Sequence, residues 1–216
     1  MRKLLSLFRL SRPTNMLLVF VAVVFGAVLA LPPGAPPVFG SWRELGRILA
    51  AAAALSLVAA GGYALNDRMD LAIDRVNRPR RPLPAGELSP RVAVIFTVFC
   101  WCVAGGLTLI GPPSGYFIVP FCILSSIAYA LRLKHAGLAG NLAVALMTSL
   151  ALAYGATALE GLSRVLPLAS LAFLVLVVVL ILLAIRYMLN RPVRSLVAFA
   201  GQVADGNLDA AIRGRF

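Results

Sequence analysis

Apolar runs long enough to cross a lipid bilayer recur along the chain. A membrane-spanning helix needs about 20 consecutive, mostly apolar residues. Six stretches approach that length: 15–31, 45–65, 92–110, 116–131, 139–159 and 166–189. Of the 216 residues, 61% are hydrophobic and only 13% are charged, whereas about 25% are charged in a soluble domain. The sequence therefore predicts an all-α, polytopic membrane bundle of about six transmembrane helices.

The basic residues concentrate on one side of this predicted topology. With six spans and the amino terminus inside, 17 of the 20 Lys and Arg residues fall on the cytoplasmic side, and only Arg43, Arg47 and Arg164 fall outside. This bias is typical of helical membrane proteins. It predicts a multi-pass protein of the cell membrane with both termini cytoplasmic. The net charge of +12 does not indicate a nucleic-acid partner, because no soluble groove-reading module is visible.

Four oxygen-bearing side chains share one face at the carboxyl end of the second predicted span. On a helix that advances about 100° per residue they lie within an arc of about 100°: Asn66, Asp67, Asp70 and Asp74. Such hard oxygen ligands suit Mg²⁺, and ionisable groups at a span end usually face a cavity or a partner. A solvated acidic helix end is the alternative, but it accounts for Asp74 and not for the shared face. The pattern predicts a Mg²⁺ site.

The next segment, residues 75–86, combines arginines with prolines. Pro79, Pro82 and Pro84 exclude a helix and stiffen the backbone, so the arginines are held in place. Guanidinium groups donate bidentately to phosphate oxygens, which suits a diphosphate beside a metal site. A basic loop also anchors any membrane protein to its cytoplasmic face. The position of this loop directly after the acidic face favours phosphate binding.

Together these motifs resemble the first signature of the UbiA superfamily of intramembrane prenyltransferases. That signature is carried by Asn-Asp-x-x-Asp-x-x-x-Asp at 66–74 and Asn-Arg-Pro-x-Arg-Pro-Leu-Pro-x-Gly at 77–86. Further pieces agree with the family in order and place: Arg-Pro-x-Asn at 12–15, Tyr129 and Lys134 at the end of the fourth span, and Gly-Asn at 140–141. The resemblance covers about residues 9–158.

The resemblance implies Mg²⁺-dependent transfer of a polyprenyl group from a prenyl diphosphate to an acceptor, with release of diphosphate. It implies Asn66 and Asp70 as metal ligands, with Asp67 or Asp74 assisting, and Asn66, Asp70 and Asp74 form the expected metal set. The expected catalytic residues are Asp67, Asp70, Asp74 and Lys134. The expected substrate-binding residues are Asn15, Arg75, Arg78, Arg81, Tyr129 and Asn141. Family acceptors include aromatic rings and the glycerol phosphate headgroup of archaeal lipids, and the basic loop leans slightly towards the latter.

The second part of the sequence departs from the family pattern. Family members usually have nine spans and a second Asp-x-x-x-Asp motif, which these 216 residues do not contain. We therefore expect an incomplete bundle that, alone, binds its substrate but transfers it poorly or not at all, unless a second chain or a separate partner closes the bundle. The expected division is a UbiA-like amino-terminal half over 1–160, a final transmembrane helix over 161–189 and a separate tail over 190–216.

The tail resembles the start of a HAMP linker, the helical relay that follows the last span of many bacterial sensors. Its apolar residues at 193, 196, 200 and 203 are spaced 3, 4 and 3 apart, a heptad seam that would pair with a second chain. This predicts a homodimer through the tail. A juxtamembrane amphipathic helix on anionic lipid is the other interpretation. The second functional hypothesis is accordingly a non-catalytic membrane sensor or scaffold that signals through the tail.

Overall fold

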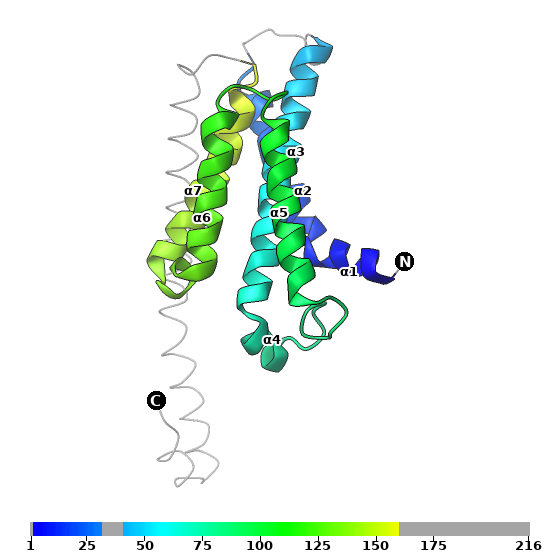
Figure 1. Ribbon diagram of the computed structural model, residues 1–216. Helices are drawn as coiled ribbons and strands as arrows, with labels where there is room; N and C mark the ends of the chain where they lie inside the picture. Colours follow the sequence, from blue (N-terminus) through cyan, green and yellow to red (C-terminus); the bar gives the residue numbers. More distant parts are fainter. Residues whose placement is uncertain (1, 32–40, 160–216) are drawn as a thin grey trace, which may run out of the picture. The chain divides into compact units, whose positions relative to one another are not determined.

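The computed structural model describes residues 2–31 and 41–159, and these residues form helices joined by loops (Figure 1). The helices are α1 (Arg2–Leu10), α2 (Pro13–Leu29), α3 (Trp42–Met69), α4 (Leu71–Asn77), α5 (Pro90–Leu107), α6 (Gly115–Leu131) and α7 (Leu138–Ala156), with a short 3₁₀ helix, η1, at Leu133–His135. The described part contains no strand. The predicted all-α class is therefore confirmed there.

Five of these helices correspond to the first five predicted spans. By length and hydropathy, α3, α5 and the stretch Ala139–Ala156 of α7 are each sufficient to cross a membrane. Helices α1 and α2 meet that criterion together, as a pair bent by 50°, while the apolar α6 has only 17 residues. The described residues thus contain three or four candidate spans. The sixth predicted span, 166–189, and the tail, 190–216, lie outside the described residues.

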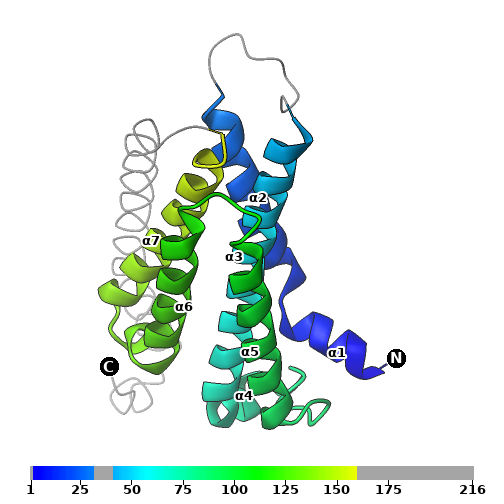
Figure 2. The same cartoon turned by 45° about the horizontal axis from the view of Figure 1, so that its top comes forward.

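Helix α3 is the central element of the described bundle, with α2, α5, α6 and α7 packed around it (Figures 1 and 2). Its alanine run explains this position, because Ala51, Ala52 and Ala54 are completely buried. Small side chains let helix backbones approach closely, which is the main source of packing energy between helices in lipid.

The contact between α2 and α7 depends on two glycines. A Cβ added at Gly26 would lie 2.0 Å from the carbonyl oxygen of Leu152, and one added at Gly155 would lie 1.8 Å from that of Val23. At each glycine, the backbone of one helix therefore packs directly against a backbone carbonyl of the other. No side chain larger than hydrogen fits at either position.

The helix is interrupted between α1 and α2, and the chain changes direction sharply at Arg12. Arg12 has the left-handed angles φ 53° and ψ 68°, which are uncommon for a residue with a side chain. Pro13 then opens α2 at its first position, where its missing N–H costs nothing. As a result α1 turns away from the bundle, and it extends to one side in Figures 1 and 2.

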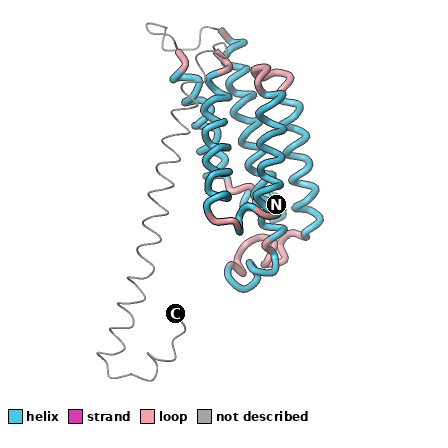
Figure 3. The backbone as a smooth tube through the Cα atoms, turned by 90° about the vertical axis from the view of Figure 1, so that its left-hand side faces the viewer, coloured by secondary structure: helices cyan, strands magenta, loops and turns pink. Residues whose placement is uncertain are grey.

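A second break separates α3 from α4 at Asp70, whose angles are φ −89° and ψ 6°. The sequence predicts one continuous helix through residues 66–74, and the structure differs at this point. Two backbone bonds nevertheless bridge the break, from the Asp70 N–H to the Asn66 carbonyl (2.9 Å) and from the Asp74 N–H to the Asp70 carbonyl (2.8 Å). Helix α4 and the loop to α5 lie together at one end of the helices (Figure 3).

Candidate active site

Ionisable side chains from distant parts of the sequence gather where α3 ends. Asp67 is 3% exposed, and its Oδ1 accepts hydrogen bonds from the guanidinium groups of Arg12 and Arg81, the latter at 3.0 Å. The same Nη1 of Arg81 also donates to Oδ2 of the buried Asp74 at 2.6 Å. Arg81 thus joins the two buried carboxylates, and Arg12 adds a second positive charge at Asp67. We call these four residues the Asp67 network.

The backbone conformation of Arg12 and a contact with Tyr63 explain how its side chain reaches Asp67. Its left-handed backbone ends α1 and directs the side chain towards α3. The Cζ atom of Arg12 also lies 5.0 Å from the centre of the Tyr63 ring, a distance at which a cation is attracted to an aromatic face. Uncommon backbone angles persist only when their surroundings hold them. The contacts of the Arg12 side chain with Asp67 and Tyr63 supply that support.

A second group forms on the other two residues of the motif. The Asn66 amide Nδ2 donates to Asp70 Oδ2 at 3.0 Å, and Lys134 Nζ lies 2.5 Å from Asp70 Oδ1. Lys134 comes from η1, which follows α6. The Oδ1 atom of Asn66 is buried and has no hydrogen-bond partner among the described residues. We call these three residues the Asp70 group.

The four oxygen-bearing residues therefore do not form one cluster. Arg81, an expected substrate-binding residue, lies between Asp67 and Asp74 and forms ion pairs with both. Within residues 2–31 and 41–159, no three Asp, Glu, His or Cys side chains are close enough together to hold a metal ion.

The Asp70 group nevertheless fits Mg²⁺ better than the Asp67 network does. The unpartnered Asn66 oxygen and the Asp70 carboxylate are neighbouring oxygen donors. Mg²⁺ typically takes one or two carboxylates and completes its shell with phosphate oxygens and water. Asp74, a ligand in the predicted set, instead has its Oδ2 bonded to Arg81.

An apolar cavity of about 430 Å³ opens beside the Asp70 group, between α2, α3, α6 and α7. Most of its wall is aliphatic, including Leu18, Val19, Leu55, Val58 and Met147. Polar side chains line the rest: Arg12, Asn15, Tyr63, Asn66, Ser126, Tyr129 and Thr148. Asn15 and Tyr129, which the sequence predicts as substrate-binding, thus line the same cavity as Asn66.

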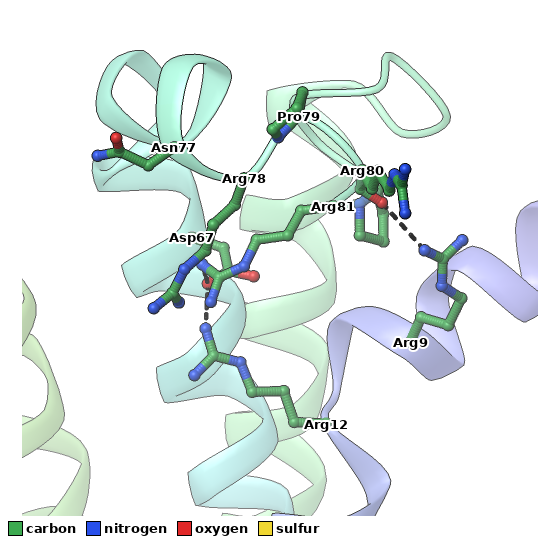
Figure 4. A pocket seen from close by; sticks show the side chains of 9 residues that line it. Arg9, Arg12, Asp67, Asn77, Arg78, Pro79, Arg80 and Arg81 are labelled. Carbon is green, nitrogen blue, oxygen red and sulfur yellow. Dashed lines mark hydrogen bonds and ion pairs between the residues drawn. The ribbon is translucent and has the colours of Figure 1, made fainter.

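A second, open cavity of about 570 Å³ has Asp67 in its wall (Figure 4). We call it the arginine pocket. Its wall is formed by Arg9, Arg12, Asp67, Asn77, Arg78, Pro79, Arg80, Arg81 and Pro82. Among these residues five are cationic and one is acidic. Arg12 lines both cavities, so the two lie on either side of its side chain.

The remaining predicted site residues lie further out. Arg75 is exposed on α4, and Asn141 is exposed in the first turn of α7. Neither lines the two cavities described here, and their proposed roles stay predictions. Tyr63 is a contact that the motif analysis missed, although it lies one turn before Asn66 and Asp67 on the same helix. That spacing could have indicated it.

Glu87, also missed, links the loop to α1. Its Oε2 accepts a hydrogen bond from the Ser6 hydroxyl at 2.7 Å, and Arg9 Nη1 lies 3.2 Å from its Oε1. The Ser6 hydrogen bond, with the nearby Arg9 charge, holds the pKa of Glu87 below its usual value of 4.5. Arg9 also donates to the backbone carbonyl of Arg80 at 3.0 Å. Helix α1 is therefore attached at two points, Arg80 and Glu87, to the loop between α4 and α5.

Known proteins resemble this chain in sequence. The model of the UbiA prenyltransferase family matches residues 17–205. The digeranylgeranylglyceryl phosphate synthase of Thermococcus gammatolerans is 33% identical over 173 residues, which cover 80% of this chain and 60% of that protein. The enzyme of the same name from Saccharolobus solfataricus is 34% identical over 149 residues, covering 69% and 53%. The chain thus spans a little over half the length of these curated relatives.

The fold has a counterpart among solved structures. A structure from work on digeranylgeranylglyceryl phosphate synthase in membranes superposes with a TM-score of 0.71 at 23% identity, covering 82% of this chain and 60% of that one. The family match extends to residue 205, well beyond the limit near residue 158 that the motifs indicate, and includes part of the HAMP-like segment. The resemblance of that segment to HAMP linkers stays a prediction. With its apolar helices and this match, the chain is an integral membrane protein of the UbiA prenyltransferase family.

Proposed function

We propose that this protein takes part in the Mg²⁺-dependent transfer of a geranylgeranyl group from its diphosphate to a glyceryl phosphate acceptor. The observation that carries the proposal is the apolar cavity with Asn66 at its polar end, next to Asp70 and Lys134. An amphiphile with a long hydrocarbon chain and an anionic head matches such a cavity. The relatives named above are synthases of digeranylgeranylglyceryl phosphate.

In this proposal the prenyl chain lies among the aliphatic side chains of α2, α3, α6 and α7. The diphosphate lies near Lys134, whose ammonium group would stabilise the charge that builds up as the bond from C1 to the diphosphate oxygen breaks. Asn66 and Asp70 would hold Mg²⁺, which would supply further charge neutralisation when bound. The cavity wall keeps water away from C1.

One bond at C1 of the prenyl chain is broken and one is formed. The diphosphate leaves with the electron pair of the C1–O bond, the acceptor hydroxyl attacks C1 to form an ether, and the hydroxyl proton passes to the departing diphosphate. Arg81 is tied to Asp67 and Asp74, so we assign it a positioning role: it fixes the loop that carries Arg78 and Arg80.

The arginine pocket favours the glyceryl phosphate acceptor over an aromatic one. A phosphate monoester carries up to two negative charges, and arginine pairs with phosphate bidentately. An aromatic acceptor such as 4-hydroxybenzoate carries only the single negative charge of its carboxylate. The pocket adjoins the apolar cavity at Arg12, so an acceptor with its phosphate there could present its hydroxyl towards the donor.

Calorimetric titration of the purified protein, loaded with Mg²⁺ and a non-hydrolysable thio analogue of geranylgeranyl diphosphate, tests the proposed acceptor. Glyceryl phosphate carrying one geranylgeranyl chain should bind about tenfold or more tightly than the same lipid without its phosphate. Both lipids carry the same hydrocarbon chain, so after correction for their separately measured micelle partitioning the difference reports on the phosphate.

A variant sharpens this comparison. The double substitution Arg78→Gln and Arg80→Gln should remove most of the preference for the phosphate and leave binding of the donor analogue unchanged. Equal affinity of the two lipids, or saturable binding of 4-hydroxybenzoate in their place, would overturn the proposed acceptor. Failure of the donor analogue to bind would overturn the proposed reaction altogether.

A further inference from the structure

Helix α1 turns an apolar face away from the protein, although Leu10 on its other side is buried. Its apolar face, formed by Leu4, Leu5 and Phe8, is 71%, 61% and 59% exposed. Its polar residues Ser6 and Arg9 point to the protein, where they bond to Glu87 and to the Arg80 carbonyl. A surface helix in water has charged and polar residues on its outward face instead. The environment outside α1 must therefore be apolar.

The height of α1 along the bundle identifies that environment. Leu10, at the end of α1, packs in a buried cluster with Ala64, Leu83, Leu88 and Ala93. Ala64 precedes the charged end of α3 by less than one turn, and Ala93 lies in the first turn of α5. Helix α1 thus meets the bundle at the level where the spanning helices pass from apolar to charged sequence. That transition marks the boundary between hydrocarbon and headgroups.

Charge and direction agree with this placement. The 50° bend at Arg12 turns α1 away from the axis of α2, so α1 does not simply lengthen that span. Lys3 is exposed on α1, and the sequence places Arg2 beside it. A short helix with an apolar face and basic residues binds in the plane of an anionic membrane surface.

We propose that α1 is an interfacial helix that lies in the membrane surface on the side of the basic loop. Leu4, Leu5 and Phe8 insert among the upper acyl segments, and Lys3 contacts anionic headgroups. Since Arg9 lines the arginine pocket and holds the Arg80 carbonyl, the lipid surface also supports one wall of that pocket. This inference does not depend on the proposed reaction.

Spin labels test the proposal by collision with oxygen, which concentrates in lipid, and with a nickel chelate, which stays in water. Single cysteines are placed at Leu4, Phe8 and Lys3 in a chain whose Cys100, Cys102 and Cys122 are replaced by alanine. The protein is reconstituted in vesicles of phosphatidylcholine and phosphatidylglycerol. Labels at 4 and 8 should favour oxygen and lie just below the phosphates, whereas the label at 3 should favour nickel.

Each other outcome contradicts the proposal. Nickel access at all three positions would place α1 in water, and depths near the bilayer centre for 4 and 8 would make α1 part of a span. Removing phosphatidylglycerol should move the label at 8 closer to water, and an unchanged depth would overturn the part played by anionic lipid. If the cysteine-free chain does not fold, a photoreactive residue at position 8 or 3 of the otherwise unaltered chain replaces the labels. Cross-links to acyl chains are then expected from 8 and not from 3.

Discussion

At the residue scale, four neighbouring oxygen-bearing side chains serve two different environments. Asp70 interacts with Asn66 and Lys134, whereas Asp67 and Asp74 both pair with Arg81. The helical arc placed all four on one face, whereas the helix breaks at Asp70 and the four residues divide into two groups. The arc could not predict which cation each carboxylate would meet. Arg12 and Lys134 are 55 and 64 positions from their partners, so tertiary packing decides those pairs.

Substitution at the two aspartates should separate these environments. Asp67→Asn leaves two partly buried guanidinium groups without their shared counter-charge, and we expect it to lower the free energy of unfolding by about 2 kcal/mol. This loss is smaller than is usual when a fully buried ion pair is broken, because both arginines retain some contact with solvent. Asp70→Asn, in the more exposed group, should cost less. Thermal denaturation in one detergent measures both, and the reverse order would contradict the assignment of Asp67 as the structural carboxylate.

At the scale of elements, the sequence predicted five apolar helices (α2, α3, α5, α6 and α7) within a few residues, since each is a plain apolar run. It did not predict α1 as a separate helix or the break at Asp70. Pro13 is compatible with both a helix start and a bend, and only the contacts of Arg12 with Asp67 and Tyr63 favour the bend. Breaks of this kind are set by tertiary contacts, which spacing does not record.

The close contact of α2 with α7 gives a prediction with a matched control. Gly155→Ala would force a methyl group against the Val23 carbonyl, and we expect a loss of about 2 kcal/mol or more. Gly105→Ala, on α5, has nothing within 4 Å of the new Cβ and should be neutral or slightly stabilising. Equal denaturation midpoints for the two variants would show that α2 and α7 do not pack as described.

The attachment of α1 to the loop should depend on pH. The pKa of Glu87 is lowered from 4.5 by its Ser6 hydrogen bond and the charge of Arg9. The contact is therefore complete above about pH 4.5 and is lost as the pH falls through the lower, folded-state pKa. A spin label at Leu5 should become more mobile over that range. In Glu87→Gln the label should be mobile at every pH, and a transition identical to wild type there would assign it to another group.

At the scale of the whole molecule, the motifs predicted the family, and the match to residues 17–205 confirms it. The two cavities were not predictable, because their walls come from six helices and the loop after α4. No local sequence pattern contains the angles at which these helices cross. The sensor hypothesis and the homodimer rest on the tail, which lies outside the described residues. Both stay predictions.

The topology predicted from the basic residues is testable on intact cells. The loop between α4 and α5 should be cytoplasmic, and the turn before α6 should face outward. A membrane-impermeant maleimide should label Pro113→Cys from outside and reach Ala85→Cys only after the membrane is opened. Both positions are exposed in the structure. Labelling of Ala85→Cys in intact cells would show that the protein has the opposite orientation in the membrane.

The central claim is that the apolar cavity and the Asp70 group form a Mg²⁺-dependent site for a prenyl diphosphate. Titration calorimetry of the purified protein with geranylgeranyl diphosphate, with Mg²⁺ and with EDTA, tests it directly. We expect Mg²⁺ to tighten binding about tenfold or more, Asp70→Asn to abolish that gain, and Glu87→Gln, at the other end of the loop, to preserve it. Donor affinity that is the same with EDTA as with Mg²⁺, or a full Mg²⁺ effect in Asp70→Asn, would contradict the site described here.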